Sequence, residues 1–134
     1  MSEATYVVRK WVKPDDLNQH GALFGGRLLQ WVDEEAAIVA ITQLGTIEVV
    51  TRHISALDFV ARAERGDLLE LEYRVLSFGR TSLSLSCRVF NSVTGHDILR
   101  LENIVFVAVD SDGNPVAHGQ TLTTAGTERL RTAG

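Results

Sequence analysis

Residues 16–44 read DLNQHGALFGGRLLQWVDEEAAIVAITQL, and this segment sets the plan of the whole chain. It opens as a polar loop whose aspartate and asparagine side chains can satisfy free backbone donors. Gly25 and Gly26 then allow another group to approach the backbone closely. No glycine or proline follows until residue 45, and the leucines, alanines and glutamines in between favour helix. The segment therefore predicts a loop that leads into a long helix.

The predicted helix carries carboxylates on an otherwise apolar surface. At about 100° per residue, its apolar side chains point to nearly every side, which is typical of a helix buried in a core. Asp33 nevertheless lies one turn from Leu29 and Ala37, so its neighbours along the helix are apolar. Carboxylates are rarely buried without a partner or a chemical task. Asp33 is therefore the leading catalytic candidate, and a pairing across a subunit interface is the alternative.

The remaining chain consists mainly of alternating apolar and polar residues, which indicates strands. The predicted strands cover residues 6–12, 46–59, 68–78, 81–90 and 98–109, and the second is long enough to bend. Cys87 lies on the apolar side of its strand, so we expect it in the core and not as a nucleophile. A strand, a buried helix and four antiparallel strands predict an α+β fold, in which one curved sheet wraps around one helix.

One flank of the helix would remain uncovered by this sheet, so we expect a dimer in which a second copy covers it. The polar segment from residue 116 onwards is expected to be loose or peripheral. We therefore assign residues 1–118 to a single domain and residues 119–134 to a C-terminal tail.

Composition narrows the functional classes. The chain has 134 residues, of which 45% are apolar and 22% charged, and its net charge of −4 argues against nucleic acid as the main partner. No apolar run approaches the roughly 20 residues needed to span a bilayer, and no secretory signal is visible. Because the single cysteine cannot form an internal disulfide, we expect a cytoplasmic protein. His53, His96 and His118 lack the spacing of metal ligands, so no metal site is predicted.

Several short motifs occur together at spacings that resemble one protein family. They are Asp16-x-Asn18-x-x-Gly21-x-x-Phe24-Gly25-Gly26, Asp33-Glu34, Val49-Val50-Thr51, Asp58-Phe59, Gly66-Asp67, Gly79-Arg80-Thr81-Ser82 and FVAVD-x-x-G-x-P at residues 106–115. Over about residues 5–118 the chain resembles the hotdog-fold acyl-CoA thioesterases, and more narrowly their acyl-CoA hydrolase branch. The resemblance implies a hotdog fold and hydrolysis of acyl-CoA to a carboxylic acid and free CoA. It also implies homodimers that assemble further into hexamers, with no cofactor besides the CoA of the substrate.

The resemblance also implies roles for individual residues. Asp33 matches the catalytic aspartate, and His20 matches a polar residue that works from across the dimer interface. Gly25 and Gly26 would supply amides that polarise the thioester carbonyl. Arg80 matches an arginine on the CoA path, and Thr81, Ser82 and Asn18 are assigned to CoA binding with it. Arg62 stands where many members have proline, and we assign it no role.

These residue types suit thioester hydrolysis. A carboxylate in apolar surroundings is a better base near neutral pH, and helix amides left open by glycines suit a developing oxyanion. The sequence leaves open whether Asp33 is a general base or a nucleophile, and we favour the base. Two other classes remain as alternatives, namely a hotdog hydratase or dehydratase and a non-catalytic acyl-CoA-binding module.

Overall fold

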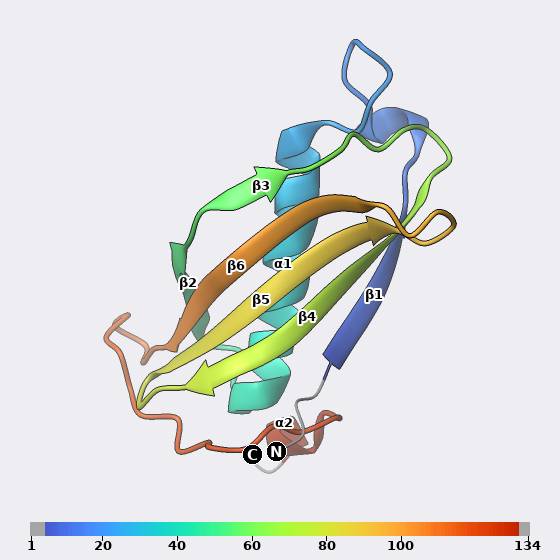
Figure 1. Ribbon diagram of the computed structural model, residues 1–134. Coiled ribbons are helices and arrows are strands. Elements are labelled where there is room, and N and C mark those ends of the chain that lie inside the picture. Colours follow the sequence, from blue (N-terminus) through green and yellow to red (C-terminus); the bar gives the residue numbers. More distant parts are fainter. Residues whose placement is uncertain (1–4, 132–134) are drawn as a thin grey trace.

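One antiparallel sheet and one long helix form most of the protein (Figure 1). The structure is a computed structural model, and it describes residues 5–131. In spatial order the strands are β1 (Thr5–Trp11), β4 (Leu68–Phe78), β5 (Ser82–Asn91), β6 (Asp97–Ala108) and β2 (Val49–Ile54), while the short β3 (Leu57–Phe59) also pairs with β6. The helices are the short turn η1 (Pro14–Asp16), the long α1 (Gly25–Leu44) and α2 (Glu128–Arg131).

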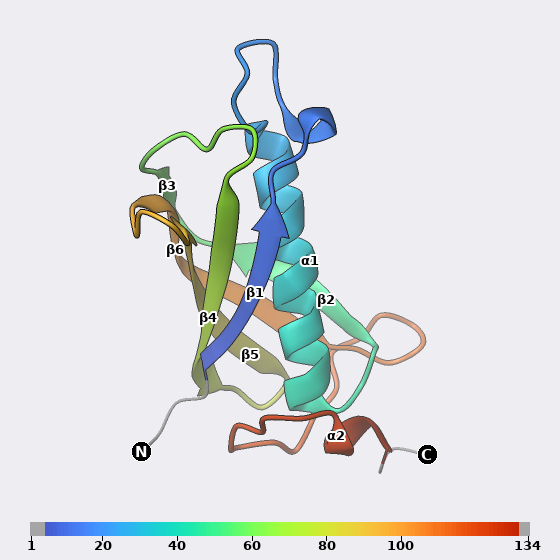
Figure 2. The same ribbon diagram turned by 90° about the vertical axis from the view of Figure 1, so that its right-hand side faces the viewer.

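The predicted α+β architecture is confirmed. The sheet lies against one side of α1 and curves around it, as the side view shows (Figure 2). One predicted strand differs, because residues 46–59 form two strands, β2 and β3, with a break at Ser55. There the Ser55 amide donates to the Asn103 carbonyl, and the Ser55 hydroxyl accepts the Asn103 amide at 2.9 Å. These two hydrogen bonds hold the turn between β2 and β3, both of which pair with β6.

The core lies between the concave face of the sheet and α1. The alternation of β5 places Leu83, Leu85, Cys87 and Val89 against the helix, and each is at most 3% exposed. Burial raises the pKa of the Cys87 thiol to about 12, so the thiol stays protonated and the predicted core role is confirmed. The buried Tyr73 hydroxyl donates to the Val32 carbonyl at 2.7 Å, which ties β4 to the middle of α1.

One flank of α1 is left uncovered, as predicted. Gln30, Glu34 and Ile38 are exposed there, and Ile38 retains 52% of its surface. The adjacent strand β2 forms an edge of the sheet, where Val50 and Ile54 are 45% and 44% exposed. The flank and the strand edge thus leave apolar side chains without a covering layer.

The C-terminal tail, expected to be loose or peripheral, is held against the end of α1 by hydrogen bonds. Gln43 is fully buried, and its side chain donates to the Thr124 carbonyl at 2.7 Å and accepts the Thr124 amide at 3.0 Å. The Tyr6 hydroxyl bonds to both Gln43 and Thr124, and Arg129 donates to the Gln43 carbonyl at 2.7 Å. The tail therefore closes the C-terminal end of α1. Neither α1 nor α2, within residues 5–131, has the length and apolarity needed to cross a bilayer.

Candidate active site

A buried carboxylate holds the loop before α1 in place. Asp16 is 5% exposed, and its side chain accepts the Lys13 amide at 2.9 Å and lies 3.5 Å from Arg27 of the first helical turn. Its carbonyl accepts the Phe24 amide at 2.9 Å. Asp16 thus satisfies a free backbone donor, as expected from its place in the polar loop. The structure shows that it joins the end of η1 to the start of α1 and thereby fixes the intervening loop.

The first turn of α1 presents free amides. Phe24 precedes the helix and provides no capping side chain, and the first helical hydrogen bond runs from Leu28 to the Phe24 carbonyl. Within the described residues, the amides of Gly25, Gly26 and Arg27 have no hydrogen-bond partner. A Cβ added to Gly26 would lie 3.1 Å from the Phe24 ring, so glycine suits this close contact. These N–H groups can stabilise a negatively charged oxygen.

A pocket of about 330 Å³ opens beside these amides. Its lining includes Asn18, Gly25, Phe59 and Arg62. The Asn18 Oδ1 atom accepts the His20 amide at 2.8 Å and the Ala22 amide at 3.2 Å, which braces the loop. Its Nδ2 group has no protein partner in residues 5–131, so it remains a donor at the pocket.

His20 does not line this pocket. It lies in the loop that protrudes beyond the start of α1 (Figure 1), where it is exposed and its ring lies 3.4 Å from the Gln19 amide nitrogen. Its carbonyl accepts a hydrogen bond from Arg62 at 3.2 Å, and Arg62 also lies 3.8 Å from Glu64. Within one protomer the structure thus brings Asn18, and not His20, to the free amides.

Asp33 lies farther along α1, at the edge of the uncovered flank. It is half-buried, and its Oδ1 atom accepts a hydrogen bond from the Thr51 hydroxyl of β2 at 2.9 Å. The apolar neighbours expected for Asp33 are those along the helix, and this polar contact crosses from the helix to the sheet edge. No role for Thr51 was predicted from its motif. Thr51 is the one side chain of the described residues that hydrogen-bonds Asp33.

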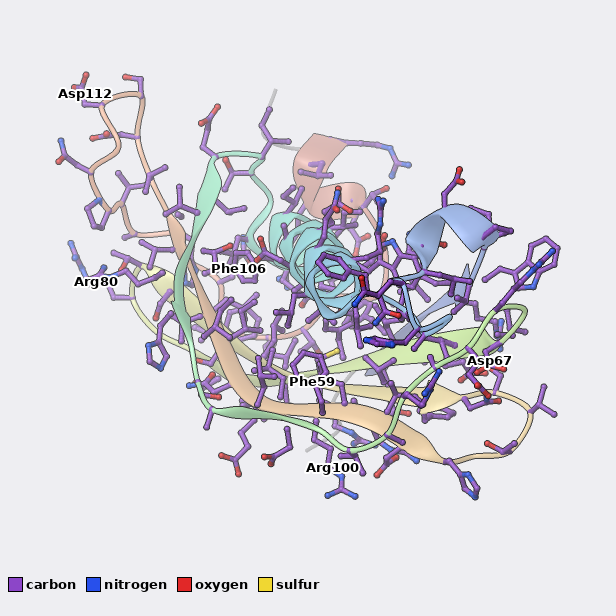
Figure 3. The ribbon with its side chains drawn as sticks, turned by 90° about the horizontal axis from the view of Figure 1, so that it is seen from above. Phe59, Asp67, Arg80, Arg100, Phe106 and Asp112 are labelled. Atoms are coloured by element: carbon purple, nitrogen blue, oxygen red, sulfur yellow. The ribbon has the colours of Figure 1, made fainter. Side chains whose placement is uncertain are left out.

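The segment assigned to CoA lies in another part of the protomer. Arg80 is exposed at the turn between β4 and β5, far from Phe59 at the pocket (Figure 3). Leu83 of β5 pairs with Phe106 of β6, and Phe106 pairs with Thr51 of β2. The start of β5 therefore lies level with Thr51, two strands away in the sheet. Two strand spacings amount to about 10 Å. Thr81 and Ser82 are half-buried at the same strand end.

The candidate residues therefore form three separate groups in one protomer. The first contains Asn18 and the glycine amides, the second Asp33 with Thr51, and the third Arg80 and its neighbours. Asp33 follows Gly25 by eight helical residues, and at 1.5 Å per residue the two backbones are about 12 Å apart.

A curved antiparallel sheet around one central helix, with this motif pattern, defines a hotdog-fold protein. Residues 20–96, more than half of the chain, match the family model described as the thioesterase superfamily, and the chain belongs to that family.

The similar proteins include several that are named as acyl-CoA hydrolases or thioesterases. An uncharacterized acyl-CoA thioester hydrolase of Bacillus subtilis is 32% identical over 85% of this chain and 67% of its own length. The crystal structure of an apo-hexameric acyl-CoA thioesterase superposes with a TM-score of 0.77 and 34% identity, covering 96% of this chain and 85% of that one. An acyl-CoA hydrolase of Staphylococcus aureus, solved with butyryl-CoA and CoA, has a TM-score of 0.76 and 28% identity over 96% and 79% of the two chains.

Further structures of the Staphylococcus aureus hydrolase carry alanine in place of a threonine, an asparagine or an aspartate. The replaced asparagine and aspartate are the same number of positions apart as Asn18 and Asp33. The replaced threonine follows that aspartate by 17 positions, whereas Thr51 follows Asp33 by 18.

Proposed function

We propose that this protein is an acyl-CoA thioester hydrolase that converts acyl-CoA and water into a carboxylic acid and free CoA. The main supporting observation is that the free amides of Gly25 and Gly26 lie at a pocket. The same helix carries the carboxylate of Asp33, which a hydrogen bond holds in place. The names of the relatives agree with the proposal. A purely binding module would derive no benefit from placing a carboxylate near the bound thioester.

In the proposed mechanism the thioester carbonyl oxygen accepts hydrogen bonds from the amides at the start of α1. Asp33 removes a proton from a water molecule as the water oxygen attacks the carbonyl carbon. The tetrahedral oxyanion is stabilised by the amides, and it collapses as the C–S bond breaks. The CoA sulfur leaves as a thiolate and takes up the proton held by Asp33, which gives the carboxylic acid and the free CoA thiol and restores the Asp33 carboxylate.

The site is proposed to be shared between two protomers. A water molecule positioned for attack must be about 3–3.5 Å from the carbonyl carbon, whereas Asp33 and the amides of its own chain are separated by about 12 Å along the helix. A partner that covers the open flank of α1 and the β2 edge can bring its own amides to Asp33. We therefore propose a homodimer, and the apo-hexameric relative supports further assembly to a hexamer.

Asn18 is proposed as the polar residue of the loop that contacts the carbonyl, because its free Nδ2 donor lies at the pocket. His20 remains the second candidate, and its exposed ring would need a contact from the partner. Arg80, Thr81 and Ser82 are proposed to bind the CoA moiety, with Arg80 offering a guanidinium to its phosphates. Cytoplasmic location stays a proposal, supported by the single buried thiol of Cys87.

The test is release of free thiol from acyl-CoA, measured with a thiol reagent. The purified protein should release CoA from acyl-CoA, and a hydratase or a binding module would not. The variant Asp33→Asn should lower kcat at least about 10²-fold, because general-base catalysis contributes about that much. Hydrolysis at the wild-type rate by the folded variant would remove Asp33 from the mechanism.

A further inference from the structure

We propose that His118 is a positioning residue for CoA binding, because it holds the backbone of the β4–β5 turn that carries Arg80. The inference rests on the proposed hydrolase function, in which Arg80 contacts a CoA phosphate. The sequence alone predicted no role for His118.

His118 is half-buried in a part of the chain that is otherwise exposed. Residues 111–117 are all exposed, whereas His118 is partly covered. After β6 the chain turns at residues 110–114 and returns along the end of the sheet, where the Val116 amide donates to the Ala108 carbonyl at 2.9 Å. The end of β6 and the β4–β5 turn lie at the same end of the sheet (Figure 1). The returning chain therefore brings His118 to the turn.

Two hydrogen bonds connect His118 to the turn. Its backbone amide donates to the Arg80 carbonyl at 3.2 Å, and its Nε2 atom lies 2.9 Å from the Ser82 carbonyl oxygen. Because a carbonyl oxygen only accepts, Nε2 is the donor in this bond. The Ser82 carbonyl also accepts the Gly79 amide at 2.9 Å, which closes the turn itself. The imidazole thus adds a second donor to the oxygen on which the turn closes.

The imidazole ring is itself held in one orientation. The Gln120 amide donates to Nδ1 at 3.0 Å, so the two partners of the ring together assign the tautomer that is protonated on Nε2. The ring also lies beside Phe78, the last residue of β4, with ring centroids 6.0 Å apart. A ring fixed at both nitrogens and at one face is well suited to hold another segment in place.

The support matters because the Arg80 side chain is exposed, so the backbone of the turn sets its position. The Arg80 and Ser82 carbonyls bond to His118, and the Thr81 carbonyl accepts the Ala108 amide at 2.9 Å. A turn that also adopts other conformations binds its ligand more weakly, in proportion to the fraction that is competent to bind. Loss of the imidazole should therefore weaken CoA binding and leave the chemical step unchanged.

His118→Phe and His118→Gln form a matched pair of variants. Phenylalanine keeps a ring beside Phe78 and loses both ring nitrogens, whereas glutamine keeps an amide N–H for the Ser82 carbonyl. We expect His118→Phe to raise KM for acyl-CoA and Kd for CoA about fivefold, which is the usual net effect of one neutral hydrogen bond, with kcat within about twofold. His118→Gln should stay within about twofold of the wild type in all three quantities. Thiol release gives KM and kcat, and calorimetry gives Kd.

Two further variants separate positioning from a general loosening of the tail. Gln43→Leu breaks hydrogen bonds to Thr124, where the tail is attached to α1, and it should lower stability without changing Kd. In an Arg80→Ala background, His118→Phe should change Kd by less than about twofold, because the side chain that it positions is already absent. If His118→Phe does not fold, His118→Leu also lacks both nitrogens and takes its place.

An unchanged Kd in the folded phenylalanine variant would overturn the positioning role. So would an equal rise of Kd in Gln43→Leu, or a full fivefold effect in the Arg80→Ala background. If the wild type binds CoA but releases no thiol from acyl-CoA, the proposed hydrolase function fails, and the Kd values still decide the role of His118. If the wild type does not bind CoA, both proposals are wrong.

Discussion

At the scale of single residues, we expect Thr51 to influence catalysis by orienting Asp33. Its hydroxyl donates to Asp33 at 2.9 Å and fixes one carboxylate oxygen, which leaves the other oxygen for water. A hydrogen bond to a charged group contributes about 1.5–3 kcal/mol, so losing it should lower the rate by about tenfold or more. We expect Thr51→Val to lower kcat by this factor with little change in KM.

The control is Thr51→Ser, which retains the hydroxyl and should keep most of the activity. The comparison of kcat with the free energy of unfolding separates positioning from stability, because Thr51→Val should lower kcat while the variant stays folded. If serine and valine behave alike, Thr51 does not orient the carboxylate.

Arg80 is exposed at the β4–β5 turn, and its proposed contact is with a CoA phosphate. Arg80→Ala should raise KM for acyl-CoA more than it lowers kcat, because the contact is shared by the bound substrate and the transition state. The increase should shrink as salt is added, since screening weakens an exposed ion pair. Initial rates at low and high ionic strength measure both effects, and an unchanged KM at low salt would contradict the assignment.

At the scale of elements, the C-terminal end of α1 depends on the tail. Gln43→Leu keeps the side-chain size, leaves the Thr124 amide without its partner and removes one of the two hydrogen bonds to the Thr124 carbonyl, which keeps the Tyr6 hydroxyl. We expect this change to lower the free energy of unfolding by about 2–4 kcal/mol, measured by urea denaturation at a fixed protein concentration.

Thr42→Val is the matched control for that change. Its hydroxyl donates to the Val39 carbonyl within the helix, and the helical backbone retains its bonds without it. We expect the control to cost less than about 1 kcal/mol. An equal loss in the two variants would mean that the tail contributes nothing to the stability of α1.

The elements that were predictable are those with local signals. The strands β4 and β5 follow from alternation, and α1 follows from the run from Arg27 to Leu44, which contains no glycine or proline. The contact of Thr51 with Asp33 was not predictable, because the curvature of the sheet brings β2 to the helix edge. The Gln43–Thr124 contact was missed for a similar reason, since a polar tail has no periodicity that indicates where it binds.

For the candidate site, the sequence nominated Asp33 and the two glycines as candidates, and their separation follows from their spacing on one helix. The sequence could not show that Asn18 lies at the pocket while the neighbouring His20 lies outside it. The positions of Asn18 and His20 depend on the path of the loop, which the buried side chain of Asp16 holds in place.

At the scale of the whole molecule, the active unit should combine residues from two chains. Asn18→Ala and Asp33→Ala proteins should each be nearly inactive, and mixing them should restore activity once subunits exchange. Each mixed dimer would then contain one site in which both residues are intact. A parallel mixture of His20→Ala with Asp33→Ala decides whether His20 or Asn18 complements the partner's aspartate.

Native mass spectrometry confirms the exchange, and the two homodimers kept apart provide the baseline. If exchanged mixtures stay inactive, Asp33 and the loop residue belong to the same chain's site or do not cooperate.

Because Asp33 follows Gly25 by eight positions along one helix, we expect catalysis to depend on protein concentration. If neither protomer alone can bring a carboxylate to its own amides, dilution below the dissociation constant of the dimer should extinguish turnover per chain, even though every chain remains folded. Concentrating the sample should bring turnover back without refolding. Total activity would then rise more steeply than in proportion to protein concentration, so the turnover per chain would depend on how much of the protein is present.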